Sequence, residues 1–144
     1  MRKFNVAVVG ATGAVGEELF RVMEEYNFPI NNLLPLASAN SAGSKIEFNG
    51  KEYTVVELTD SVFEKYEIDI AFFSAGGNIS EKFAKFAVEA GAVVIDNTSH
   101  FRMDENVPLV VPEVNPEEIL KWKNTGIIAN PNCSTIQLVG ALYP

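Results

Sequence analysis

The chain has 144 residues, 47% of them hydrophobic, with one cysteine and a net charge of −8 at pH 7. This composition predicts one globular domain in a reducing compartment, hence a cytoplasmic protein, and excludes an internal disulfide framework. The chain has no basic run and no apolar stretch near the ~18 residues of a membrane span, which argues against nucleic acid and membranes as partners. An anionic ligand would therefore be bound locally, by backbone N–H groups and a few placed cations.

Strand and helix patterns alternate along the chain. They predict, in order, a strand at residues 4–9, a helix at 15–26, a strand at 33–37, hairpin strands at 45–48 and 51–57 around Asn49-Gly50, a strand at 68–73, a helix at 80–90, a strand at 92–96, a helix opened by Asn115 and closed by Gly126, a strand at 126–129 and a helix at 134–142. The alternation predicts an α/β fold, a doubly wound, mainly parallel Rossmann-like sheet with an inserted antiparallel hairpin. Ligands of such sheets bind at the carboxyl ends of the strands, so the loops after the parallel strands should share one edge.

The stretch GATGAVG, residues 10–16, follows the first predicted strand and opens the first predicted helix. Its G-x-x-G-x-x-G spacing is related to the dinucleotide fingerprint. In that fingerprint one glycine makes a tight turn, one lets the backbone approach a pyrophosphate, and one lets helix and strand pack closely. The context predicts nucleotide binding at the start of the helix, with a merely structural loop as the alternative.

The loop after the second predicted strand, ASANSAGSK at residues 37–45, influences the choice of coenzyme. NAD sites usually place an acidic residue there to bind the ribose hydroxyl. This loop has no acid to repel a 2′-phosphate, while its serines, Asn40 and Lys45 could hydrogen-bond or neutralise one. The loop therefore favours NADP, with a plain polar loop as the alternative.

Cys133 lies between the last predicted strand and the last predicted helix. A lone cysteine is more often a buried small hydrophobe than a nucleophile, so both interpretations stay open. The predicted ligand edge, the helix N-terminus and the polar neighbours Asn132, Ser134 and Thr135 favour the nucleophile. Beside a nicotinamide, the thiolate would attack an aldehyde, and the adduct would pass hydride to the coenzyme and leave an acyl thioester.

In chain order, GATGAVG, SAGG, DNTSHFRM, VPLVVPEVN and NPNCSTIQ resemble the N-terminal half of the aspartate-β-semialdehyde dehydrogenase family, over essentially the whole chain. The resemblance implies NADP-dependent, reversible reductive dephosphorylation of L-4-aspartyl phosphate to L-aspartate 4-semialdehyde, which serves lysine, threonine and methionine biosynthesis. It implies aspartate semialdehyde or aspartyl phosphate, with inorganic phosphate, as small-molecule partners. No metal site is predicted.

The same resemblance implies roles for individual residues. Cys133 would be the nucleophile, Arg102 would bind phosphate or the substrate carboxylate, and Asn132 would help to orient the acyl group. The residues implied at the coenzyme are Gly10, Thr12, Gly13, Ala14, Val15, Ser38, Asn40, Ser41, Ser74, Ala75, Gly76 and Asn97. Asn40 stands where many members carry arginine, which leaves use of NAD open beside NADP.

The family also has a second domain, for substrate binding and dimerisation, which supplies the catalytic histidine. Residues 1–144 are therefore expected to be the dinucleotide-binding domain carrying the nucleophile, and to be inactive alone. The complete protein is expected to be a homodimer or a dimer of dimers. His100, the single histidine, is interpreted as a bystander in a polar loop, with a direct acid/base role as the alternative.

Two other functions stay open at this point. N-acetyl-glutamyl-phosphate reductase is similar in chemistry and architecture, but its cysteine typically follows glycine and precedes Tyr-Pro, whereas Asn132 and Ser134-Thr135 flank Cys133. A non-catalytic nucleotide-binding module would tolerate Cys133→Ser without loss. A purely structural domain would bind no dinucleotide.

Overall fold

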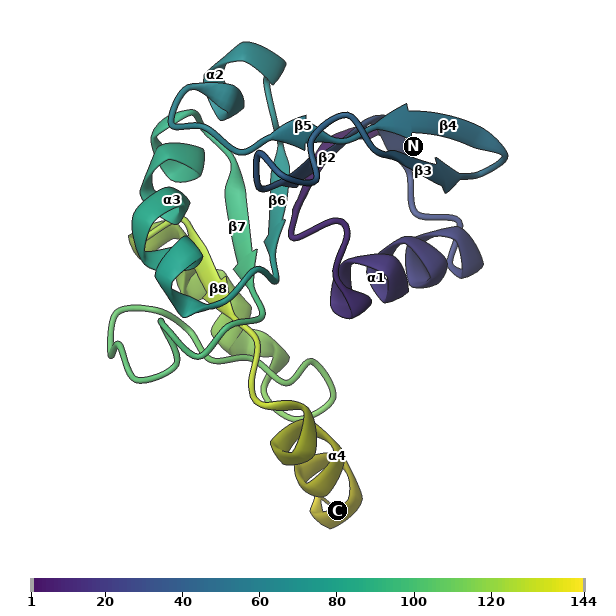
Figure 1. Ribbon diagram of the computed structural model, residues 1–144. Coiled ribbons are helices and arrows are strands. Elements are labelled where there is room, and N and C mark those ends of the chain that lie inside the picture. Colours follow the sequence, from purple (N-terminus) through teal and green to yellow (C-terminus); the bar gives the residue numbers. More distant parts are fainter. Residues whose placement is uncertain (1, 144) are drawn as a thin grey trace.

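Six short strands form one parallel sheet within residues 2–143, the part of the chain that the computed structural model describes (Figure 1). The strands are β1 (Phe4–Val9), β2 (Ile30–Ala37), β5 (Val56–Glu57), β6 (Ile70–Phe73), β7 (Val93–Asp96) and β8 (Ile127–Ala129). Their order across the sheet is β5-β2-β1-β6-β7-β8, and every pairing is parallel. This order is that of the dinucleotide-binding Rossmann folds, so the predicted fold class is confirmed.

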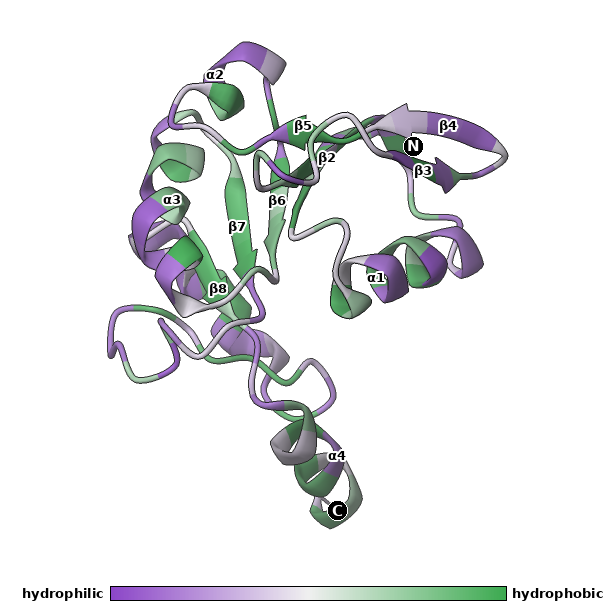
Figure 2. Cartoon of the chain, viewed as in Figure 1, coloured by the Kyte–Doolittle hydropathy of each residue, from purple (hydrophilic) through white to green (hydrophobic). Residues whose placement is uncertain are grey.

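Helices lie on both faces of the sheet because consecutive residues of its central strands are apolar, and Figure 2 shows β6 and β7 largely in green. α1 (Ala14–Glu25) packs on one face, and α2 (Val62–Tyr66) with α3 (Gly77–Glu89) packs on the other. Side chains of β1 alternate between the two cores: Val6 and Val8 pack with Phe20 of α1, whereas Ala7 and Val9 pack in the cluster that holds α2 and α3. The sheet therefore positions the end of β1 between two covered faces.

The predicted hairpin is present, but one of its strands is shorter than expected. β3 (Lys45–Phe48) and β4 (Lys51–Thr54) pair antiparallel, and Asn49 and Gly50 both have positive φ, as the tight turn requires. The prediction of one strand over residues 51–57 is wrong. The Val55 backbone N–H donates to the Ser44 carbonyl oxygen, and the chain then leaves the hairpin to pair as β5 with β2.

Two helical segments also differ from the sequence-based expectation. α2 was not predicted, because five residues are too few to show a helical period. The helix expected after Asn115 exists as η1 (Pro116–Asn124), but it has 3-10 geometry. None of its side chains is fully buried, so no packed apolar stripe imposes the α-helical period there.

The last helix, α4 (Cys133–Leu142), extends away from the sheet (Figure 1), and none of its residues is buried. Two of its leucines are largely exposed, Leu138 at 59% and Leu142 at 72%. No helix in the described part of the chain combines the length and apolarity needed to cross a membrane.

Candidate coenzyme and nucleophile site

The turn after β1 is built so tightly that two glycines have no room for a side chain. Gly10 has φ +91°, and a Cβ there would lie 3.0 Å from Ser74 Oγ and 3.1 Å from the Ala75 backbone nitrogen. A Cβ on Gly16 would lie 2.3 Å from the Gly10 carbonyl oxygen. The glycines thus bring β1, α1 and the loop after β6 together at one point.

The start of α1 faces this turn without a side-chain cap. Gly13 is the N-cap residue, and its own N–H donates to the Gly10 carbonyl oxygen at 3.1 Å. The first N–H groups of a helix have no acceptor within the helix, and here no side chain replaces one. The turn therefore offers backbone donors and the positive end of a helix dipole to an anion.

A pocket of about 460 Å³ lies at the carboxyl ends of β1, β2 and β6. This is the point at which the strand order reverses, where ligands of doubly wound sheets bind. Of the predicted coenzyme residues, six line this pocket: Gly10, Thr12, Gly13, Ser38, Ser74 and Ala75. Ala14 and Val15 begin α1 beside it, and Gly76, with φ +99°, is the N-cap of α3.

Five apolar residues of this pocket are absent from the predicted coenzyme residues: Val9 and Ala37, which end β1 and β2, and Leu58, Ile79 and Phe83. Leu58 directly follows β5, the edge strand that the sequence did not predict as separate. Ile79 and Phe83 are four residues apart on α3, and this spacing is the signal that could have identified them. Leu58, Ile79 and Phe83 give the pocket an apolar part of its wall.

The loop after β2 is partly as expected for a 2′-phosphate site. Its backbone turns on the Ser38 carbonyl oxygen, which accepts from the N–H groups of Ser41 at 2.9 Å and Ala42 at 3.0 Å. Asn40 is exposed. Lys45 is directed elsewhere, because its ammonium donates to Thr54 Oγ1 at 2.6 Å and lies 3.3 Å from Glu52 Oε1. The hydroxyl and amide groups remain as candidate ligands, whereas Lys45 is held across the hairpin.

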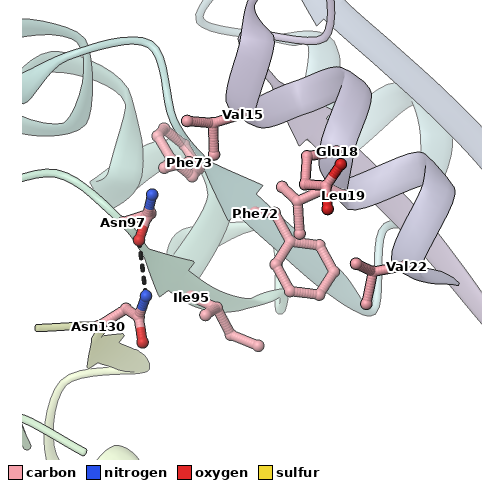
Figure 3. Close-up of a pocket in the computed structure, with 9 residues that line it drawn as sticks. All are labelled: Val15, Glu18, Leu19, Val22, Phe72, Phe73, Ile95, Asn97 and Asn130. Carbon is pink, nitrogen blue, oxygen red and sulfur yellow. Dashed lines mark hydrogen bonds between the residues drawn. The ribbon is translucent and has the colours of Figure 1, made fainter. Parts of the chain in front are cut away.

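The loops after β7 and β8 meet at the same edge of the sheet. The Asn130 side-chain amide donates to Asn97 Oδ1 at 2.6 Å (Figure 3). Arg102 Nε donates to the Asn130 carbonyl oxygen at 2.9 Å, and Nη2 donates to the Asn97 carbonyl oxygen at 3.0 Å. No carboxylate pairs with Arg102 in the described chain, so its charge is oriented but not neutralised.

Asn97, which was predicted at the coenzyme, is not among the residues that line the pocket of the glycine turn. With Val15 and Asn130 it lines a second pocket, of about 330 Å³, between α1 and the sheet (Figure 3). The rest of that pocket is mainly apolar, with Phe72 and Ile95 on the sheet side.

Cys133 is exposed, so the interpretation as a buried small hydrophobe is wrong. It is the first residue of α4, and Asn132 is the N-cap. The Asn132 side-chain oxygen accepts from the Ser134 backbone N–H at 2.9 Å. Asn132 is thus fixed as a helix cap, and it holds Cys133 at the N-terminus of the helix, in the loop after β8.

His100 lies in the turn that precedes Arg102. Its ring packs edge-on against Phe101, with ring centroids 4.5 Å apart, and the residue is exposed. No side-chain hydrogen bond holds its ring among the described residues.

Within residues 2–143, no group of three or more His, Cys, Asp or Glu side chains is placed so that it could hold a metal ion.

The strand order and the glycine turn define the class of protein: a dinucleotide-binding domain of the Rossmann type. Residues 5–122 match the family described as "Semialdehyde dehydrogenase, NAD binding domain", and the chain belongs to this family. It is 68% identical over 143 residues to aspartate-semialdehyde dehydrogenase of Campylobacter jejuni, a match that covers 99% of this chain and 42% of that protein.

Solved structures agree with this assignment. The chain is similar to aspartate semialdehyde dehydrogenase II of Vibrio cholerae complexed with ASA, with a TM-score of 0.94, 55% identity, and 98% of this chain and 45% of that chain covered. It is also similar to the Candida albicans enzyme with NADP, with a TM-score of 0.79, 28% identity, and 98% and 46% of the two chains covered. The chain spans less than half the length of these relatives.

Proposed function

We propose that this chain is the coenzyme-binding and nucleophile-bearing part of an aspartate-semialdehyde dehydrogenase. The complete protein would catalyse the NADP-dependent, reversible reductive dephosphorylation of L-4-aspartyl phosphate to L-aspartate 4-semialdehyde. The observation that carries this proposal is the placement of Cys133. It is an exposed thiol at a helix N-terminus, at the same sheet edge as a glycine turn that no side chain could fill.

The residues at the glycine turn fit a dinucleotide. The backbone of the turn can lie close to a bound dinucleotide because Gly10 and Gly16 carry no side chain, and neither position has room for a Cβ. The uncapped start of α1 suits a pyrophosphate. The coenzyme, when bound, supplies a hydride acceptor or donor. A relative of known structure is described with NADP, which supports NADP as the coenzyme, with NAD as a second candidate because Asn40 gives no cation.

The chemistry assigned to Cys133 is nucleophilic. In the oxidative direction its thiolate adds to the aldehyde carbon to give a hemithioacetal, which loses hydride to become an acyl thioester. Inorganic phosphate then attacks the thioester carbon, the C–S bond breaks, and aspartyl phosphate leaves as Cys133 regains its thiolate. The substrate class is supported by a relative described in complex with ASA.

Arg102 is proposed to bind the phosphate or the substrate carboxylate. Guanidinium has five N–H donors, and in the described chain Arg102 uses Nε and one donor of Nη2 on backbone carbonyl oxygens. Both donors of Nη1 stay available, and no carboxylate competes for the charge. A cation oriented by neutral acceptors suits an anion that must enter and leave in each turnover.

We also propose a domain organisation, a subunit number and a compartment for the complete protein. Residues 1–144 would form the dinucleotide-binding domain, a second domain would supply the general base, and the complete protein would be a cytoplasmic homodimer or dimer of dimers. Sedimentation of the complete protein tests the subunit number.

The test of the function uses the complete protein with Cys133→Ala. We expect NADPH formation from aspartate semialdehyde to depend on phosphate in the wild type, and to fall by ~10³ or more in the variant. NADP binding should be retained, because Cys133 lies outside the pocket of the glycine turn. A variant that keeps phosphate-dependent turnover would show that Cys133 is not the nucleophile. A wild-type protein that binds NADP but shows no turnover would favour a non-catalytic nucleotide-binding module.

A further inference from the structure

Asp96, the last residue of β7, is a fully buried carboxylate that the proposed reaction does not use. Its relative exposure is 0%, and no cation pairs with it in the described chain. A buried carboxylate is costly unless hydrogen bonds compensate it. Two other buried polar residues surround it, Ser80 at 0% exposure and Thr98 at 7%.

Ser80 and Thr98 donate hydrogen bonds to both carboxylate oxygens of Asp96. Ser80 Oγ donates to Asp96 Oδ1 at 2.7 Å, and Thr98 Oγ1 donates to Asp96 Oδ2 at 2.8 Å. The Thr98 backbone N–H also reaches Oδ1, at 3.3 Å. We call these three residues the Asp96 cluster. It joins β7, the first turns of α3 and the loop after β7.

The backbone of Asn97 is held in place by this cluster, because the residues on either side of it, Asp96 and Thr98, are members of the cluster. Its own N–H donates to the Phe73 carbonyl oxygen at 2.8 Å, and its carbonyl oxygen accepts from Arg102. The Asp96 carbonyl oxygen accepts from the Asn130 N–H at 2.8 Å, and Asn130 in turn binds Arg102 and the Asn97 side chain (Figure 3). Every hydrogen bond that orients Arg102 therefore ends on a residue next to or bonded to Asp96.

We propose that the Asp96 cluster is a positioning unit, which sets the direction of the Arg102 guanidinium for its anionic ligand. The proposal rests on the proposed function, since it needs Arg102 to bind phosphate or a carboxylate. Asp96 is not itself a catalytic residue, because its oxygens are buried and occupied by donors of the same chain. Its effect passes through the backbone of Asn97 and Asn130.

The cluster acts through hydrogen-bond geometry and not through charge, and asparagine can test this. In Asp96→Asn, Oδ1 can accept from Ser80 and from the Thr98 N–H, while Nδ2 donates to Thr98 Oγ1. The Thr98 hydroxyl proton can then turn to Ser80 Oγ, which lies 3.2 Å away. Asparagine thus keeps a hydrogen bond at each contact, with the one to Thr98 Oγ1 reversed, whereas Asp96→Ala leaves at least one of the two buried hydroxyls without an acceptor.

The experiment measures phosphate KM, NADP KM and the melting temperature of the complete protein carrying Thr98→Val. Thr125→Val is the matched control, because in the described chain the Thr125 hydroxyl bonds only to the backbone of Ile127, at the amino end of β8. We expect Thr98→Val to raise the phosphate KM about tenfold, with the NADP KM within about twofold of wild type. Thr125→Val should change neither, and Asp96→Asn should stay within about threefold of wild type.

The outcomes separate the possibilities. If Thr98→Val lowers only the melting temperature, or matches Thr125→Val in both constants, the cluster is merely structural and the proposal is overturned. If Asp96→Asn loses as much phosphate affinity as Asp96→Ala, charge and not geometry acts, which also overturns it. A wild-type protein whose turnover does not depend on phosphate overturns the proposed function, and with it the ligand assigned to Arg102.

Discussion

Gly16 has the least space of any glycine in the described chain. The position of its missing Cβ is 2.3 Å from a backbone oxygen, which cannot move without opening the glycine turn. Gly140, in α4, has nothing within 4 Å of the same position. Glycine is therefore required by the lack of space at position 16, whereas position 140 has room for a side chain.

We expect Gly16→Ala to destabilise the protein by ~1–3 kcal/mol and to remove most NADP affinity, because the turn must shift to admit the methyl group. Gly140→Ala should leave coenzyme affinity unchanged and should not lower stability. Thermal unfolding and NADP titration of both variants check this. A Gly16→Ala protein with wild-type stability and affinity would contradict the geometry.

We propose Asn40 as the residue at which coenzyme choice can be changed. The loop carries no free cation, since Lys45 is bound across the hairpin. We expect Asn40→Arg to raise the ratio of kcat/KM for NADP to that for NAD by about tenfold, through a charge-assisted hydrogen bond to the 2′-phosphate. Asn124→Arg, an exposed site before β8, controls for net charge. An equal change in both variants would mean that only overall charge matters.

At the scale of elements, helices and strands with long apolar patterns could be predicted from the sequence, whereas elements of a few residues could not. The positions along the chain of α1, α3, the hairpin turn and the parallel strands other than β5 followed from hydrophobic period and turn residues. β5 and α2 were missed because they have two and five residues, too few for a period. The geometry of η1 was missed because its composition suits either kind of helix.

Parts of the candidate site could likewise be predicted from the sequence and other parts could not. The glycine turn and Cys133 have motifs of their own, so the sequence identified them. The Asp96 cluster, and the place of Leu58 beside Ile79 and Phe83, depend on contacts between residues that are far apart in the chain, such as Ser80 with Asp96. No local pattern encodes those contacts.

The end of α2 carries backbone strain that can be relieved. Glu67 follows this helix with φ 49° and ψ 54°, a left-handed conformation that costs a side-chain-bearing residue ~1–2 kcal/mol. We expect Glu67→Gly to raise the free energy of unfolding by up to ~1 kcal/mol, after the added freedom of the unfolded chain is subtracted. Glu64→Gly, inside the same helix, should lower it by a similar amount. Denaturant titration distinguishes the two, and a shared sign would refute the assignment of strain.

At the scale of the whole molecule, α4 leaves apolar surface without a partner in the described chain. Its leucines are exposed, and Tyr143 directly after it is 53% exposed. Apolar patches of this kind promote association between proteins. The net charge of −8 opposes association at low salt.

We expect the 144-residue chain to self-associate through α4, and more strongly as salt screens the net charge. Leu138→Glu should shift the sedimentation profile towards monomer. Tyr26→Glu adds the same charge at an exposed aromatic residue away from α4, and it should have little effect. If both variants act alike, charge repulsion alone explains the shift.

The order of the strands along the chain also determines which parts of the site can fold first during synthesis. β1, β2 and β6, which carry the glycine turn and its pocket, precede β8 in the chain, and β8 is the edge strand beyond β7. The ribosome releases the N-terminal strands first. The nascent chain can therefore complete its coenzyme pocket while Cys133 is still unplaced, so the proposed nucleophile reaches the sheet edge after the pocket has formed.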